Sequence, residues 1–571
     1  MPAATPMSRS ALARFAAPLL ASASAFLAGC GAGSEPLPVE NVLLVTLDTT
    51  RADALLDEPS AATLAPRIAQ LVAGGVRFPH AYSVAPLTLP AHASILTGLV
   101  PPRHGLRDNG HAALPGEADT LAERLGGQGF ETAAFVSALV LDRGFALDQG
   151  FERYDQPALR TRTNDASSVE RDAEATTGAF LAWLEERDDE RPFFAWVHFY
   201  DAHVPYRPNA AHLERAGGDS YRGELAVLDD AVGVLLDALE ERGLDASTLV
   251  VLTADHGESL GEHGEPAHGA YCYEATMRVP LVFRFPGAQP EPGPLRLASL
   301  VDLYPTVLGS LGFSIPEGLD GFDLFAPGVP FPRGVYFESY AGYLNYGWSP
   351  LAGWLDARGK YLASSDPEFY LAWQDPAEKQ DLAASRQEEC EAARDRIAEL
   401  LERPSLEPVE DVVSDDLSSA LDALGYARGD RAGGTHVPSP LEPSDLPSPR
   451  SRADELMPLL RANALFQAQR YGECLPLVEQ IVRENPRHLL ALDLYALCLM
   501  YAREFPEAEA VLRRRLALEE VADSRLNLGL CLLELDRPEE ARLEIERANA
   551  LVPGQPAIAE ALQRVRHALG R

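Results

Sequence analysis

The chain has 571 residues, 46% of them hydrophobic, and is long enough for several globular domains. Its formal net charge of −36 at pH 7 argues against a nucleic-acid partner, because phosphate backbones require a basic surface. The same charge does not exclude an anionic substrate, since a bound metal ion can reverse the field inside one pocket.

The N-terminus has the pattern of an export signal. Arg9 and Arg14 precede an apolar run over residues 15–27, which is too short to span a bilayer as a mature helix. The run ends in Leu-Ala-Gly-Cys at residues 27–30, which resembles a bacterial lipobox. We therefore expect residues 1–30 to be a lipoprotein signal peptide. The exported protein would be anchored through a lipidated Cys30 to a bacterial membrane, facing the periplasm or the cell exterior. An ordinary signal peptide with a chance cysteine is the alternative.

Strand-like and helix-like segments alternate from about residue 38 to residue 400. Apolar runs predict strands over residues 41–47, 131–137, 193–199, 248–253 and 280–285. Amphipathic periodicity predicts helices over residues 119–125, 177–186, 223–242 and 298–311. This alternation predicts an α/β domain with a largely parallel sheet, in which functional groups gather where strands end.

The remaining chain divides into a linker and a helical region. Residues 403–452 are rich in Pro, Ser, Asp and Gly and are interpreted as a flexible linker. Within residues 453–571, the pairs Arg470-Tyr471, Glu504-Phe505 and Arg537-Pro538 recur at spacings of 34 and 33 residues. This period resembles about three tetratricopeptide (TPR) repeats, whose stacked helix pairs bury a core that one pair alone could not. Such repeats imply a protein partner; an unrelated helical bundle is the alternative.

The cysteines beyond Cys30 show no spacing typical of a zinc site or a disulfide framework. Their number is odd, and three of them fall at helical core positions in the C-terminal region. We expect all of them to be buried apolar residues: Cys272, Cys390, Cys474, Cys498 and Cys531.

Three segments carry the candidate chemistry. Asp48 follows the apolar run 41–47, and Asp255-His256 follows a second apolar run that begins near residue 249. A carboxylate at a strand end that faces a cleft suits a divalent cation, although Asp48 could instead cap a helix. Between them lies Thr88-Leu89-Pro90, in which Pro90 fits a first helical turn, and the helix start adds N–H groups for an anion.

Together these segments resemble the sulfatase family of the alkaline phosphatase superfamily. The resemblance covers about residues 38–395 and includes the stretches 198–206, 255–281, 300–306 and 375–382. It implies a catalytic domain over residues 31–402, with a mixed sheet, flanking helices and a small C-terminal subdomain. It also implies one divalent metal ion held by Asp48, Asp255 and His256, with calcium expected first and magnesium or manganese compatible.

The resemblance assigns roles to further residues. Thr88 stands where sulfatases carry a Cys or Ser that is oxidised to formylglycine, a conversion that Thr cannot undergo. Its hydroxyl would act directly as the nucleophile, activated by metal coordination. His92 replaces the Arg of the family signature and is a candidate for substrate binding. Asn109 is the candidate oxyanion donor, or else an ordinary turn residue before Gly110.

Two more histidines complete the expected site. His203 lies in a pattern that places it on the leaving-group side, as general acid or hydrogen-bond donor. His268 would lie against the anionic oxygens of the substrate, and His198 would be buried support.

These residues indicate an exported hydrolase of a sulfuric, phosphoric or phosphonic ester. Without formylglycine no geminal hydroxyl can expel sulfate by elimination. We therefore expect phosphate-type esters, more than sulfate esters, as substrates. A transferase that passes a phosphoryl-linked headgroup from the same site is one alternative. The other is a degenerate enzyme that serves as a tethered scaffold, with the repeats recruiting partners.

Overall fold

The computed structural model describes residues 38–110, 112–157, 170–291, 297–327, 333–409, 417 and 437–570. The expected signal peptide with Cys30, and most of the expected linker, lie outside the described residues. Within the described chain, no helix is both long and apolar enough to cross a membrane.

A seven-stranded sheet forms the centre of the α/β region, in the order β2-β9-β7-β1-β6-β4-β5. The central strands β1, β6 and β7 are buried throughout and run parallel. β9 is antiparallel to both of its neighbours, which makes the sheet mixed. The bounds are β1 Asn41–Leu47, β2 Val76–Arg77, β4 Glu131–Phe135, β5 Arg153–Asp155, β6 Phe193–Phe199, β7 Thr248–Ala254 and β9 Leu281–Arg284.

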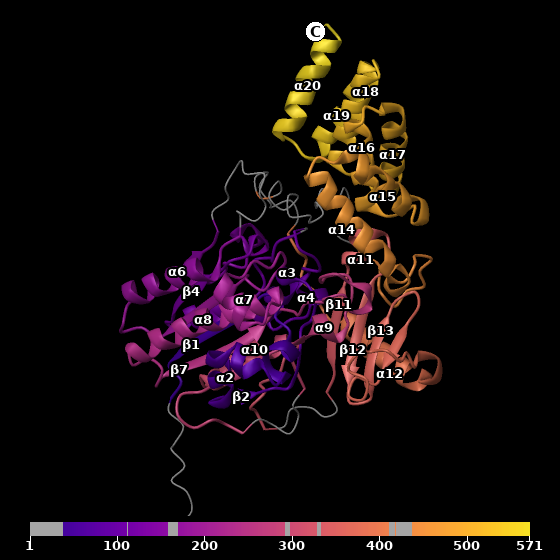
Figure 1. The fold of residues 1–571 in the computed structure, drawn as a ribbon. Coiled ribbons are helices and arrows are strands. Elements are labelled where there is room, and N and C mark those ends of the chain that lie inside the picture. The colour runs from indigo at the N-terminus through magenta and orange to yellow at the C-terminus, as the bar shows by residue number, and fades with distance from the viewer. Residues whose placement is uncertain are drawn as a thin grey trace, which may run out of the picture. The chain divides into compact units, whose positions relative to one another are not determined.

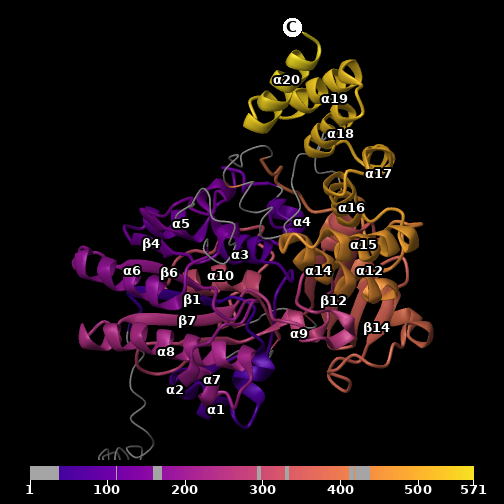
Figure 2. The same ribbon diagram turned by 45° about the horizontal axis from the view of Figure 1, so that its top comes forward.

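Helices cover both faces of this sheet (Figures 1 and 2). One face packs against α3 Thr88–Thr97, α5 Leu121–Gly127 and α10 Leu303–Ser310. The other packs against α2 Pro66–Ala73, α6 Ala173–Glu186 and α8 Ser220–Glu241. Two apolar layers thus enclose the central strands, as in other α/β domains.

The helix expected over residues 298–311 begins later than the periodicity indicates. The chain first forms β10 Leu297–Ser299 and a short 3-10 turn, η6 Leu300–Asp302. Ser299 and Asp302 form a reciprocal capping box at this point, and α10 starts only after it. The capping box satisfies the first backbone donors and therefore sets the helix boundary.

A smaller antiparallel sheet forms the expected C-terminal subdomain. Its four strands are β11 Val335–Ser339, β12 Leu351–Asp356, β13 Gly359–Ala363 and β14 Glu368–Tyr370, and α12 Gln387–Leu401 packs on one face. A third sheet joins β10 to β3 His80–Tyr82 and β8 Arg278–Val279. The shorter elements are η1 Asp53–Asp57, α1 Ala61–Leu64, α4 Pro101–His104, η2 Leu139–Leu141, η3 Arg143–Phe145, α7 Ala210–Arg215, η5 Glu262–Gly264, α9 Glu274–Met277, α11 Ala341–Tyr346 and η7 Ala383–Ser385.

The C-terminal region is helical, with consecutive helices packed against one another. Cys474, Ala508 and Ala541 occupy equivalent places in the sequence period, and each is fully buried. Small side chains at these positions let neighbouring helices approach closely, as expected for stacked pairs. The helices are α14 Ala453–Gln467, α15 Tyr471–Glu484, α16 Leu489–Tyr501, α17 Phe505–Leu518, α18 Ala522–Glu534, α19 Pro538–Leu551 and α20 Pro556–Ala568, preceded by η8 Pro449–Arg452.

The five described cysteines are free thiols. Four are buried, as expected, whereas Cys390 is only partly buried. The sulfurs of Cys474 and Cys498 lie 3.2 Å apart between α15 and α16.

The described end of the expected linker is held against the C-terminal subdomain. Tyr340 Oη donates to the carbonyl of Pro438 at 2.9 Å, and Ser349 N–H donates to the carbonyl of Pro447 at 2.8 Å. Arg450 pairs with Asp366 and Asp381, each at 2.6 Å. The composition of residues 437–452 indicated flexibility, but these contacts fix the backbone there.

Candidate active site

The strands β1 and β7 place two carboxylates side by side. They are parallel neighbours in register, with Leu47 opposite Ala254, so Asp48 and Asp255 follow their carboxyl ends together. Both side chains are fully buried. Asp48 Oδ1 and Oδ2 and Asp255 Oδ2 have no hydrogen-bond partner among the described residues. Three carboxylate oxygens are thereby left for a ligand.

His256 adds a nitrogen donor to this pair. Its Nδ1 lies 2.9 Å from the carbonyl oxygen of Gly257, which can only accept, so Nδ1 carries the proton. The unprotonated Nε2 lies 3.5 Å from Asp255 Oδ2 and 3.8 Å from Asp48 Oδ1. Thr88 Oγ1 lies 3.4 Å from the same nitrogen.

This donor set fits one divalent cation. Candidate ligand atoms of Asp48, Asp255 and His256 lie within 4.8 Å of one another. Burial raises the pKa of Asp48, and burial together with the neighbouring Asp48 raises that of Asp255, because two carboxylates out of water repel each other. A bound cation would remove this cost. The site offers it three carboxylate oxygens, one imidazole nitrogen and one hydroxyl, all of which are ordinary ligands for a divalent metal.

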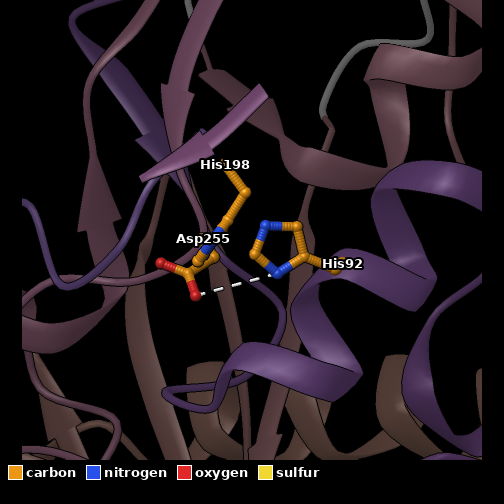
Figure 3. Close-up of side chains that lie close together, drawn as sticks. All are labelled: His92, His198 and Asp255. Atoms are coloured by element: carbon orange, nitrogen blue, oxygen red, sulfur yellow. Dashed lines mark ion pairs between the residues drawn. The ribbon is translucent and has the colours of Figure 1, made fainter. Parts of the chain in front are cut away.

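A second His-Asp group lies beside the first: His92, His198 and Asp255 (Figure 3). Both nitrogens of His92 and Nδ1 of His198 have partners within the protein, whereas His198 Nε2 has no hydrogen-bond partner among the described residues. Ser137 N–H donates to His198 Nδ1 at 3.4 Å, which leaves the ring proton on Nε2, 3.4 Å from Asp48 Oδ2. His198 is fully buried and lies next to Asp48, in line with the supporting role expected for it. Of this second group, only Asp255 Oδ2 keeps a free lone pair, and that oxygen already belongs to the first group.

His92 belongs to a chain of hydrogen bonds whose direction is determined at both ends. Trp196 Nε1–H can only donate, and it lies 2.9 Å from Thr46 Oγ1. The Thr46 hydroxyl then donates to His92 Nε2 at 3.0 Å, and His92 Nδ1–H donates to the Thr88 carbonyl at 2.8 Å. Both ring nitrogens are thus bound within the protein, and burial lowers the pKa of His92 to about 3. This geometry favours support of the Thr88 turn over the direct substrate contact expected from the sequence.

Thr46→Val tests this assignment without altering the pocket lining. Valine keeps the volume but leaves Trp196 Nε1 and His92 Nε2 unpaired in the core. We expect the free energy of unfolding to fall by about 1–3 kcal/mol, measured by denaturant titration. KM should change less than about twofold, because His92 does not face the substrate. A large rise in KM at unchanged stability would instead restore His92 as a substrate ligand.

Thr88 begins α3 and is 1% exposed, directly beside the carboxylate pair. Leu89 N–H donates to Asn109 Oδ1 at 2.9 Å, and Pro90 has no N–H. The first turn of the helix therefore offers fewer donors to an anion than the sequence indicated. The bond to Leu89 also orients the amide of Asn109, whose buried Nδ2 has no partner among the residues described. Asn109 is thereby placed to donate to a substrate oxygen.

His203 and His268 complete the cluster. Their ring centroids are 4.9 Å apart, and that of His268 is 4.6 Å from that of His256. His203 Nδ1 lies 2.7 Å from the carbonyl of Val204, so its Nε2 is the unprotonated nitrogen. Desolvation, with the neighbouring His268, lowers the pKa of His203 to about 4. All eight residues expected at the site therefore gather around the carboxyl ends of β1, β6 and β7.

Several residues of this site had no role in the sequence interpretation. Thr46 and Trp196 form the chain of hydrogen bonds that ends at His92, and Glu258 contacts His268. Thr49 is fully buried with φ 50°, a left-handed conformation that is costly for a β-branched residue. Such strain costs about 1–3 kcal/mol and clusters at functional sites. The only signal available in the sequence was the position of Thr49 and Glu258 next to the motif residues.

The comparisons with known proteins agree with this geometry. The sulfatase family model matches residues 40–313. The chain is 27% identical over 330 residues to a ulvan-active sulfatase of Formosa agariphila, covering 50% of this chain and 64% of that protein. It is 30% identical over 319 residues to human arylsulfatase A, covering 47% of this chain and 62% of that protein. The chain thus spans somewhat less than two thirds of the length of both relatives.

Among solved structures, the phosphonate monoester hydrolase of Agrobacterium radiobacter aligns with a TM-score of 0.51 at 21% identity. The alignment covers 63% of this chain and 95% of that one, and it shows the shared fold. The mixed sheet of this chain is therefore the fold that it shares with that hydrolase. Residues 40–313 thus match the sulfatase family model, and the chain is similar to sulfatases over about half of its length.

Proposed function

We propose that the protein is a metal-dependent ester hydrolase in which Thr88 attacks a sulfuric, phosphoric or phosphonic ester. The observation that carries this proposal is the position of Thr88 Oγ1, 3.4 Å from His256 Nε2 and beside the unpartnered oxygens of Asp48 and Asp255. When bound by Asp48, Asp255 and His256, a divalent cation supplies Lewis-acid stabilisation and lowers the pKa of a coordinated hydroxyl. Calcium is our first expectation, with magnesium and manganese compatible.

The side chains supply the remaining functions. Thr88 is the nucleophile, because its hydroxyl is held at the start of a rigid buried helix. Asn109 Nδ2 donates to an oxygen that gains negative charge during attack. The imidazoles of His203 and His268 flank the same space and exchange the proton of the leaving group. The pocket therefore combines a nucleophile, an oxyanion donor and a proton carrier.

We infer that phosphoric and phosphonic esters are favoured over sulfuric esters. A threonine intermediate must be released by water, because the threonine oxygen has no second hydroxyl that could expel the group by elimination. Direct hydrolysis is easier for a phospho-threonine than for a sulfo-threonine. Proteins similar to this chain include sulfatases and, at the level of fold, a phosphonate monoester hydrolase.

We also propose a location and a partner. The lipobox-like sequence supports export and anchoring to a bacterial membrane through Cys30. The buried small residues of the C-terminal helices support TPR-like stacking, which offers a surface for a protein partner.

A panel of chromogenic esters tests the proposed activity. We expect the metal-loaded full-length protein to hydrolyse 4-nitrophenyl phenylphosphonate or bis-4-nitrophenyl phosphate at least about tenfold faster than 4-nitrophenyl sulfate, as kcat/KM. Adding a polyol acceptor distinguishes hydrolysis from headgroup transfer, because transfer forms the acceptor ester. Metal binding without turnover of any ester would contradict the proposal and favour the scaffold alternative.

A further inference from the structure

Two cysteines meet between the helices α15 and α16 of the C-terminal region. The sulfur atoms of Cys474 and Cys498 lie 3.2 Å apart, and both side chains are fully buried. This separation is shorter than the roughly 3.5–4.0 Å at which two carbon atoms are in optimal contact, and sulfur is the larger atom. The two sulfurs therefore face each other with no atom between them.

We propose that Cys474 and Cys498 are a modification site, at which a disulfide-containing oxidant links α15 covalently to α16. The structure describes the reduced form of this pair. The inference is independent of the proposed ester hydrolysis, because it concerns the helical region alone. It requires oxidising surroundings, such as those outside the cytoplasm.

The bond requires only a small movement of the two side chains. A disulfide has an S–S length of about 2.0 Å, so the sulfurs must approach each other by about 1.2 Å. Cys474 lies in the first turn of α15, and Cys498 lies in the last turn of α16. A small rotation of both side chains about their Cα–Cβ bonds supplies a movement of this size and leaves the helices in place.

The alternative is that both cysteines serve only as small apolar residues at a helix contact. The next pair of helices argues against a need for both thiols. One period later, Ala508 of α17 stands at the position of Cys474, and Cys531 of α18 stands at that of Cys498. Ala508 and Cys531 are fully buried as well, and the Cys531 thiol donates to the carbonyl of Phe505 at 3.0 Å. Alanine is therefore sufficient for close packing at this position.

The pair lies at the open end of the hairpin that α15 and α16 form. The turn end is fixed by Asn485, whose Nδ2 donates to the carbonyl of Tyr346 at 2.8 Å. At the open end, the rings of Tyr471 and Tyr501 stack with centroids 4.5 Å apart, but Tyr501 is 60% exposed. Because helix ends open most easily, a covalent link stabilises the hairpin most at this end.

The bond forms by two exchange steps with an external disulfide, such as oxidised glutathione. One protein thiol loses its proton, and its sulfur attacks a sulfur of the oxidant. The other sulfur of the oxidant leaves with the electron pair and takes up a proton. The second protein thiol then loses its proton and attacks the mixed disulfide, and the remaining oxidant sulfur leaves as a thiol in the same way. The protein pair thus gives up two electrons and two protons, and the oxidant becomes two thiols.

Peptide mapping of the full-length protein tests the link. The reduced protein is equilibrated with oxidised and reduced glutathione in sub-denaturing urea, which opens the helix ends so that buried thiols can exchange. It is then alkylated and cleaved with trypsin. Cleavage after Arg483 and Arg487 places the two cysteines on separate peptides, 471–483 and 488–503. We expect these peptides to remain joined until a reductant is added.

The melting temperature gives a second measurement. After removal of urea, the helical circular-dichroism signal of the oxidised protein should melt at least about 5 °C higher than that of the reduced protein. The physical reason is that a link between residues 24 positions apart restricts the unfolded chain.

Cys474→Ala is the matched variant, because the next helix pair carries alanine at the equivalent place. It should give no joined peptides, and its melting temperature should be the same with and without reductant. Cys531→Ala removes a buried thiol that has no second thiol opposite it. This variant should keep both the joined peptides and the response to reductant.

Separate peptides under the most oxidising mixture, with Cys474 and Cys498 alkylated or carrying glutathione, would overturn the inference. A link from either residue to another cysteine would overturn it as well, and so would an oxidised protein that melts below the reduced one. Should Cys474→Ala fail to fold, the peptide map of the wild type decides alone.

Discussion

Thr88→Ala is expected to lower kcat by about 10⁴-fold or more while the fold is retained. Removal of the nucleophile of a covalent mechanism eliminates the intermediate, and only residual catalysis by binding and oxyanion stabilisation is left. Thr88 packs at the start of α3, and alanine suits this position of a helix. The measurement is kcat on the best ester of the panel, together with the melting temperature of the variant.

Thr88→Ser is the matched control, because it keeps the hydroxyl and removes only a methyl group. It should retain activity within about a factor of one hundred of the wild type. Mass spectrometry of the quenched wild-type reaction should find the transferred group on the peptide that carries Thr88, and on no such peptide of the alanine variant. Full activity in Thr88→Ala would assign the attack to another group, such as water.

Asp48→Asn is expected to weaken binding of the divalent metal by at least about 100-fold and to remove activity. Asp48 supplies two of the three unpartnered carboxylate oxygens of the cluster. For the wild type, chelation should lower the melting temperature, because a metal at 100 times its Kd contributes about 2.7 kcal/mol to stability. The variant should melt at the same temperature with and without chelator. It also carries one buried charge fewer, which favours its metal-free form.

Asp53→Asn is the control for this experiment. Asp53 is near in sequence, but its carboxylate is bound by Arg51, with Oδ1 2.9 Å from Nε, outside the metal cluster. This variant should keep the metal and the response to chelator. A wild-type melting temperature that is indifferent to chelator would contradict a metal at this site, and so would an Asp48→Asn variant that binds metal normally.

Much of the fold and of the metal cluster could be predicted from local patterns. The runs that became β1 and β7 are mostly apolar, which is typical of strands buried on both faces, and each is followed by a carboxylate. Parallel neighbours bring such ends together, so Asp48 and Asp255 were predicted to share a site. The direction of β9 could not be predicted in this way, because an apolar run does not record which way its strand runs in the sheet.

The roles of the histidines depended on residues distant in the sequence. His92 was interpreted from its place in a motif, whereas its partner Thr46 lies 46 residues away and Trp196 lies 150 residues from Thr46. Glu258 lies within residues 255–281, one of the stretches that resemble the sulfatase family, but its second partner Tyr206 is 52 residues away. No local pattern records such contacts.

The sequence by itself therefore determined which donor atoms this protein places at its strand ends, with Thr88 among them, because hydrophobic runs and their polar ends are local properties. Only the tertiary structure decided which of those atoms are free. An imidazole has two nitrogens, and the group hydrogen-bonded to one of them sets the function of the other. For His92, both nitrogens are engaged by the protein. For His256, the bond at Nδ1 leaves Nε2 only 3.4 Å from the Thr88 hydroxyl.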